Sequence, residues 1–171
     1  MQKPEIVDVV LEDLRHPTDE RPIIATAVLM KTGFRESDLE KTTEAILDAI
    51  HRQTDLVVAP EYSYSSINGP LGWDQFNIHL SRILEMSRKS DALIVPGTFE
   101  WSEGMYHNAC YVVYQGRIVY IREKTIAPLV PLDFLGQRIG IEICIENTTG
   151  LSHKNGVRDL GLACERNLSG L

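Results

Sequence analysis

The stretch DLVVAPE, Asp55 to Glu61, is a continuous apolar run that ends in a proline and a carboxylate. A short run of this kind favours a strand buried on both faces, because a strand with one wet face alternates apolar and polar residues. Strands buried on both faces belong to sheets that are covered on both sides. The run therefore indicates a buried strand, and the segments on either side of it indicate the class of fold to which that strand belongs.

Upstream of this run, RPIIATAVLM predicts a buried strand over Ile23 to Leu29. The next segment, ESDLEKTTEAILDAIHRQ, has helical spacing, and Ser37 lies three residues before Glu40, as in a capping box. The residues that share its apolar face are Leu39, Ile46, Leu47 and Ile50.

Downstream, a second helix is expected from about Asp74, with Phe76, Leu80, Ile83 and Leu84 on its buried stripe. The remaining segments read as strands: ALIVPGTFE at 92–100, a hairpin at 107–124 with its turn at QGR, RIGIEICIE at 138–146 and DLGLACE at 159–165. Strand and helix alternate first and a hairpin follows, which predicts a mixed sheet carrying helices, an α/β class.

Length and composition limit the alternatives. The chain has 171 residues, 43% of them hydrophobic, which favours one domain over 1–171 with an irregular extension at 1–21. The net charge of −7 argues against a nucleic-acid partner. No apolar run reaches the roughly 18 residues of a membrane span, and the N-terminus lacks the apolar region of a secretory signal. Three cysteines suit neither a disulfide scaffold nor a metal knuckle, so we expect a cytoplasmic protein with reduced thiols.

Three chemically active residues follow predicted strands. Glu61 comes directly after LVVAP, Lys124 ends RIVYIREK, and Cys144 lies near the end of RIGIEIC. Ligands of open α/β sheets bind at the carboxyl ends of strands, so these residues would meet through the fold.

The segments DLVVAPE, GRIVYIREKTI and RIGIEICIE, in this order, resemble the three signature segments of the nitrilase (carbon–nitrogen hydrolase) superfamily. ALIVPGTFE, YHNACYVVYQGRIV and the opening strand and helix resemble supporting parts of the same family, so the resemblance covers roughly Pro22 to Asn147. It implies an α-β-β-α sandwich that is incomplete in its second half.

The resemblance also implies a mechanism. Members use a Glu–Lys–Cys triad, which falls on Glu61 as general base, Lys124 as oxyanion stabiliser and Cys144 as nucleophile. The backbone N–H of Ile145 would assist at the oxyanion, and Asn108 matches an asparagine that helps to shape the site. No metal or organic cofactor is implied.

Each residue also has an ordinary interpretation. Cys144 could be a core residue, as we expect for Cys110 and Cys164, because cysteine is among the most often buried residue types. Glu61 could be a loop carboxylate and Lys124 a solvated charge, although strand alternation does not require Lys124 to point outward. The aromatic residues of the loops could line a pocket, but loop aromatics more often serve as local packing anchors, and the five histidines fit surface or structural roles.

The sequence departs from the family in three places. Many members carry a second glutamate shortly after the lysine, and here the position falls near Leu132 and Asp133, so Asp133 is a weak substitute candidate. The segment between Lys124 and Cys144 is short. Of the family's second half only the strand at 159–165 is expected. A fragment, a naturally short member and an oligomer whose partner fills the gap are all consistent with this.

We therefore predict a hydrolase that cleaves a non-peptide C–N bond in a small amide, or less readily a nitrile, and that forms homo-oligomers. A catalytically silent nitrilase-like protein that binds a small molecule or a partner is the first alternative. An unrelated α/β domain in which the three residues are structural is the second.

Overall fold

The computed structural model describes residues 23–28, 36–52, 54–61, 63–64, 71–102, 106–124, 132–143 and 158–162. Cys144, Ile145, Cys164 and the expected extension at 1–21 lie outside these ranges. Within the ranges, every helix is too short or too polar to cross a membrane.

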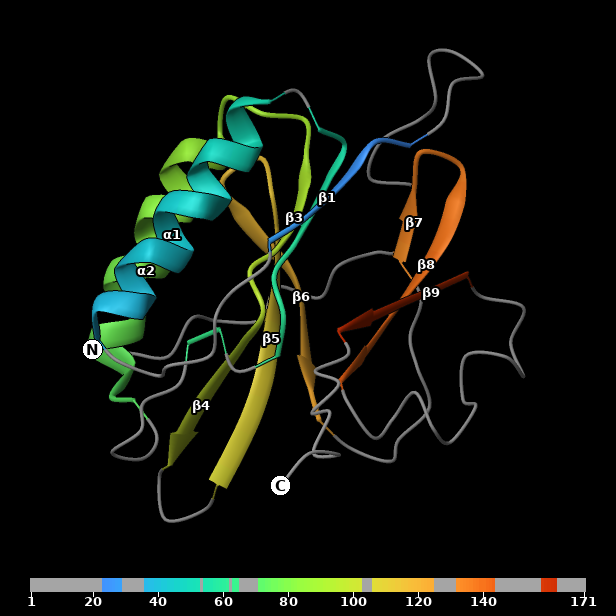
Figure 1. The fold of residues 1–171 in the computed structure, drawn as a ribbon. Helices are drawn as coiled ribbons and strands as arrows, with labels where there is room; N and C mark the ends of the chain where they lie inside the picture. The colour runs from blue at the N-terminus through green and yellow to red at the C-terminus, as the bar shows by residue number, and fades with distance from the viewer. Residues whose placement is uncertain are drawn as a thin grey trace, which may run out of the picture.

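The first sheet has six strands: β1 (Ala25–Ala27), β2 (Leu56–Val58), β3 (Leu93–Val95), β4 (Thr98–Ser102), β5 (Tyr106–Tyr114) and β6 (Arg117–Glu123). β1, β2 and β3 are parallel neighbours. β5 runs antiparallel to β3, to β4 and to β6. β1, β2, β3, β4 and β6 therefore run in one direction, opposite to β5, and β4 continues beyond the end of β3 along the same edge of β5 (Figure 1).

Two helices cover one face of this sheet, α1 (Glu36–His51) and α2 (Trp73–Ser87) (Figure 1). Their apolar stripes bury Ile46, Leu80 and Ile83 against the sheet, as the helical periodicity predicts. Phe76 stacks on Phe99, with ring centroids 4.2 Å apart. Removal of this apolar surface from water is the main force that holds the helices in place.

A second sheet covers the opposite face. It contains β7 (Leu132–Phe134), β8 (Gln137–Ile143) and β9 (Arg158–Leu162), with β8 antiparallel to β7 and parallel to β9. Its inner residues, among them Phe134 and Ile141, form a second core with Val112 of the first sheet. The chain is thus an α/β protein with helix, sheet and sheet layers, an α-β-β-α sandwich that is incomplete in its second half (Figure 1).

β2 explains why the DLVVAPE run is continuously apolar. Leu56 faces the second core, whereas Val57 faces the helices, and both are buried. The prediction of a strand buried on both faces is confirmed.

The predicted strand at 92–100 is interrupted, which corrects the sequence interpretation. It divides into β3 and β4 at Pro96 and Gly97. Gly97 has φ +90°, and a Cβ there would lie 2.4 Å from the carbonyl oxygen of Pro60. A glycine is required because the segment that leads to Glu61 passes directly against this backbone.

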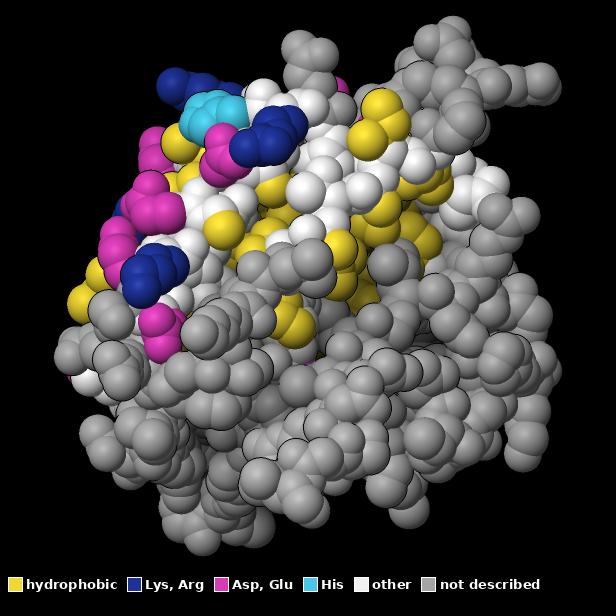
Figure 2. Space-filling model, viewed as in Figure 1, with side chains coloured by type: hydrophobic (Ala, Val, Ile, Leu, Met, Phe, Trp, Pro, Cys, Tyr) yellow, Lys and Arg dark blue, Asp and Glu magenta, His cyan; other side chains and the backbone are white. Residues whose placement is uncertain are grey.

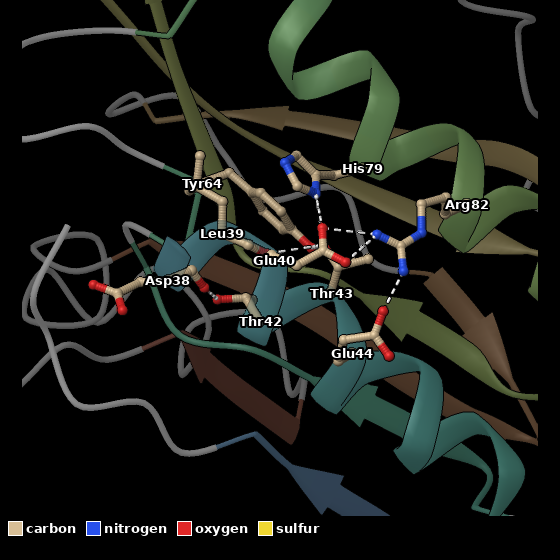
Figure 3. Close-up of polar contacts among 9 residues, drawn as sticks. All are labelled: Asp38, Leu39, Glu40, Thr42, Thr43, Glu44, Tyr64, His79 and Arg82. Atoms are coloured by element: carbon tan, nitrogen blue, oxygen red, sulfur yellow. Dashed lines mark hydrogen bonds and ion pairs between the residues drawn. The ribbon is translucent and has the colours of Figure 1, made fainter. Parts of the chain in front are cut away.

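The start of α1 also differs from the prediction. The helix begins at Glu36, so Ser37 lies within its first turn and does not precede it as a cap. The Glu40 carboxylate accepts hydrogen bonds from Arg82 of α2, at 2.7 and 2.8 Å, and Arg82 also binds Glu44 (Figure 3). These exposed charges belong to the polar face of the helix pair, which carries most of the charged side chains visible in Figure 2.

Candidate active site

The carboxyl ends of β2 and β6 hold the two described members of the predicted triad. Glu61 follows β2 by three residues, and Lys124 directly follows β6. Asn108 enters from the beginning of β5, which lies at the same edge because β5 runs in the opposite direction. Sheet topology alone therefore brings three residues together that are far apart in the sequence.

Glu61 is the centre of this group. Its Oε1 accepts a hydrogen bond from Lys124 Nζ at 2.9 Å and another from Asn108 Nδ2 at 2.9 Å. The Glu61 side chain is fully buried, while Lys124 keeps 25% of its side-chain surface exposed. A buried carboxylate needs such partners, because desolvation without compensation strongly disfavours a charge.

Backbone pairing fixes the two partners of Glu61. The N–H of Lys124 donates to the carbonyl oxygen of Asn108 at 2.8 Å, which extends the β5–β6 ladder to the site. On its other side, Asn108 is in register with Glu100 of β4. Asn108 thus lies in a strand that is paired on both edges, and this pairing fixes the backbone from which its side chain extends.

The segment that carries Glu61 is attached at both ends. Before it, the Ala59 N–H donates to Val95 at 2.8 Å; after it, the Tyr64 N–H donates to Thr98 at 3.1 Å. Ser63 Oγ donates to the carbonyl oxygen of Pro60. These bonds join the turn to β3 and β4, so the direction of the Glu61 side chain depends on both strands.

Tyr64 anchors this segment further. Its ring is fully buried and packs edge-on against Phe76, with centroids 5.4 Å apart. Its hydroxyl lies 2.9 Å from Thr43 Oγ1 in α1, and Thr43 Oγ1 also lies 2.9 Å from His79 Nδ1 of α2 (Figure 3). Burial raises the pKa of the Tyr64 phenol well above its ordinary value, so this group stays neutral.

Sequence reasoning missed this polar connection between the helices and the Glu61 segment. A threonine in a helix and a histidine 36 positions later carry no pairwise signal. The one available indication was Thr43 itself, a polar residue among the buried positions of α1. The structural roles expected for the histidines and for Tyr64 fit these contacts.

Two acceptor atoms at the centre of the site are left over. Glu61 Oε2 and Asn108 Oδ1 are both buried, and neither has a hydrogen-bond partner among the residues that the structure describes. Most buried polar atoms in folded proteins are paired, so such atoms indicate a place for a proton, a water molecule or a ligand. The group can therefore hold a proton on Oε2 while Oε1 keeps its two partners.

The other predicted residues lie elsewhere. Asp133 is in β7, in register opposite Arg138 of β8, and its role remains a prediction. Cys144 and Ile145 lie outside the described residues; the last residue of β8, Ile143, is buried in the second core. Cys110 is a core residue, as expected, and burial raises the pKa of its thiol far above the ordinary value.

The described ranges contain no cluster of three or more histidine, cysteine, aspartate or glutamate side chains able to bind a metal ion.

Comparison with known proteins gives a clear result only at the level of structure. No protein-family profile and no curated protein sequence matches the chain significantly. An amidase of the nitrilase superfamily from Nesterenkonia AN1 superposes with a TM-score of 0.59 and 14% identity, over 75% of this chain and 59% of that one. The chain has the nitrilase fold.

Other solved structures share the nitrilase fold with this chain. Glutamine-dependent NAD⁺ synthetase from Acinetobacter baumannii, bound to ADP, matches with a TM-score of 0.52 and 20% identity, over 75% of this chain and 29% of that one. A variant of the Nesterenkonia amidase, carrying the acetamide moiety of fluoroacetamide on its active-site cysteine, matches with a TM-score of 0.60 and 15% identity, over 74% and 60%. Further structures of that amidase contain acrylamide or butyramide.

The chain spans less than two thirds of the length of these proteins.

Proposed function

We propose that this protein is a carbon–nitrogen hydrolase that cleaves small amides, and nitriles less readily, through a covalent cysteine acyl-enzyme. The 2.9 Å contact between Lys124 Nζ and Glu61 Oε1 carries the proposal, because 63 residues separate a base and a cation that the nitrilase fold brings together. The small amides bound by variants of the structurally similar Nesterenkonia amidase support an amide substrate.

In this proposal Glu61 takes the proton of the Cys144 thiol on Oε2, the oxygen that has no described partner. The thiolate then attacks the carbonyl carbon of the amide. Lys124 and the backbone N–H of Ile145 stabilise the negative oxygen of the tetrahedral intermediate. The C–N bond breaks as Glu61 returns the proton to the leaving nitrogen, and ammonia departs.

Water completes the cycle. Glu61 accepts a proton from a water molecule, and the resulting hydroxide attacks the thioester carbon. The C–S bond breaks as Glu61 returns that proton to the sulfur, which releases the acid and restores both the thiol and the carboxylate. Lys124 keeps its positive charge throughout, so the same ammonium serves both oxyanions. Asn108 holds Glu61 in place, and Asp133 is the candidate for orienting Lys124.

Alkylation of the three cysteines against pH tests the triad. We expect iodoacetamide to modify Cys144 fastest, with an apparent pKa displaced from about 8.5 and changed by Glu61→Gln. Cys110 is the internal control, because its buried thiol should react only after unfolding. A substrate screen for ammonia release from butyramide, with Cys144→Ala as the blank, then tests catalysis.

A catalytically silent binding protein is the second candidate. The observation in its favour is that the two unpaired acceptors, Glu61 Oε2 and Asn108 Oδ1, would serve the binding of a small molecule without any chemical step. If Cys144 reacts like an ordinary thiol whether or not Glu61 and Lys124 are present, the binding role replaces the hydrolase.

We further propose that residues 1–171 form one domain, that it acts in the cytoplasm, and that copies of the chain associate. One domain is supported by the two cores, which lie on opposite faces of the same first sheet. Light scattering at several protein concentrations would test association.

A further inference from the structure

The carbonyl oxygen of the Asn108 side chain points to a specificity that the triad alone does not provide. Asn108 is 5% exposed, and its Oδ1 has no hydrogen-bond partner among the described residues. Its Nδ2, by contrast, donates to Glu61 Oε1 at 2.9 Å. The NH₂ group of the Asn108 side chain is thus bonded to Glu61, whereas its carbonyl oxygen can accept a hydrogen bond from a ligand.

The orientation of this amide follows from the chemistry of its neighbour. An ionised carboxylate only accepts hydrogen bonds, so the asparagine must turn its NH₂ group toward Glu61. A flipped amide would place Oδ1 against Oε1, two acceptors with no proton between them. Because the strand pairing on both edges of β5 fixes the backbone at Asn108, Oδ1 has little freedom to turn elsewhere.

A second acceptor lies on the neighbouring side chain. Glu61 Oε2 is also buried and has no described partner, and it belongs to the carboxylate that binds Asn108 Nδ2. The site therefore offers two acceptors, which a ligand with two donors would satisfy. An unsubstituted carboxamide nitrogen carries two N–H groups, an N-alkyl amide carries one, and an ester or a nitrile carries none.

We propose that Asn108 is a specificity-determining residue whose Oδ1 accepts one N–H of a primary carboxamide, while Glu61 Oε2 accepts the other. This inference deepens the proposed hydrolase function and rests on it for the identity of the substrate. A site that leaves buried acceptors unpaired rejects analogues without N–H groups much more strongly than analogues of a different chain length. The pair thus selects primary amides over N-substituted amides, esters and nitriles.

Binding to the full chain carrying Cys144→Ala tests this without turnover. The probes are butyramide, N-methylbutyramide, N,N-dimethylbutyramide, methyl butyrate and butyronitrile, and calorimetry or ligand-observed NMR measures each Kd. We expect butyramide to bind at least about tenfold more tightly than the dimethyl amide, the ester or the nitrile, with the monomethyl amide between them.

Asn108→Ala in the same background should weaken butyramide binding by about tenfold and leave the dimethyl amide unchanged. Asn77→Ala, at a half-buried position of α2, is the matched control and should change neither value. Equal losses for all probes would mean that Asn108 is merely structural and would overturn the inference. Because the probe series on the unchanged Asn108 is informative alone, a variant that fails to fold does not remove the test.

The two proposals fail differently. Equal affinity for all probes, as expected if only water molecules occupy the two acceptors, overturns the inference while an activated Cys144 still supports the hydrolase. Failure of butyramide to bind overturns it as well. Selective butyramide binding with an inert Cys144 in the unsubstituted chain removes the hydrolase and retains the amide site.

Discussion

The hydroxyl of Thr43 in α1 lies 2.9 Å from the phenol of Tyr64, the residue three positions after Glu61. Thr43 Oγ1 also donates to the carbonyl oxygen of Leu39, so its two lone pairs remain for the Tyr64 hydroxyl and for His79 Nδ1. One threonine thus joins both helices to the segment that carries the proposed base.

Thr43→Val should lower the free energy of unfolding by about 1–3 kcal/mol, because it leaves the buried Tyr64 hydroxyl without this bond. The valine keeps the shape, so little of the loss comes from packing. Urea unfolding measures the change. Thr42→Val is the matched control, since Thr42 is equally buried and bonds the carbonyl oxygen of Asp38 within the same helix. Equal losses in the two variants would contradict the role given to Thr43.

Lys124→Met should destabilise the protein by about 1–3 kcal/mol and suppress the alkylation of Cys144. The methionine retains most of the apolar stem but removes the cation from a fully buried carboxylate. Lys41→Met is the comparison, because Lys41 pairs with Asp38 on the surface, 76% exposed, where ion pairs contribute little. If the Lys124 variant unfolds at the same free energy as the parent protein and its Cys144 is alkylated at the same rate, the proposed triad is contradicted.

Gly97→Ala should destabilise by about 1–3 kcal/mol and disturb the site at the same time. The added Cβ would require a strained backbone at φ +90° and would meet Pro60 and Ser63 on either side of Glu61. Gly72→Ala is the control, since the nearest atom to its Cβ is 3.9 Å away. Unfolding and Cys144 reactivity should change together for Gly97 and stay near the parent values for Gly72.

Alkaline pH should reduce stability through three buried groups. Burial raises the pKa of Tyr111 to about 12, and it raises those of Tyr64 and Cys110 further still. The folded protein then holds protons that the unfolded chain has already released, so the free energy of unfolding falls as pH rises above about 9.

Each such proton contributes up to about 1.4 kcal/mol per pH unit. Urea unfolding at pH 8, 9, 10 and 11 measures the slope, which should be smaller for Tyr64→Phe than for the parent chain. Identical slopes would show that Tyr64 does not contribute.

The periodicity of the sequence predicts the helices and the strands that bury long apolar runs, because their patterns are local. The Gln115–Gly116 turn is equally local: both residues have positive φ, and the glycine marks it. The second such turn is harder to recognise, because Leu135 adopts φ +54° beside Gly136, and leucine is rare in that conformation. Consequently β7 was not predicted, although its partner strand was.

In the candidate site, too, the features that depend on local sequence could be predicted, and those that depend on tertiary packing could not. Glu61 and Lys124 could be proposed from motifs that end predicted strands, and Asn108 from the family resemblance; the structure brings these three together. Which atoms face one another could not be predicted, because this depends on the register of β5 and β6 and on the turn at Gly97. The two unpaired acceptors result from tertiary packing, so no local residue pattern could predict them.

The position of β5 and β6 has a consequence for protein synthesis. The segment from β1 to β3 emerges first from the ribosome and includes Glu61, but the two donors to its carboxylate are at 108 and 124. Until the later hairpin docks, we expect that carboxylate to stay hydrated. Closure of the hairpin would then expel the water, so a nascent chain completes the hydrogen bonds of this carboxylate in one late step.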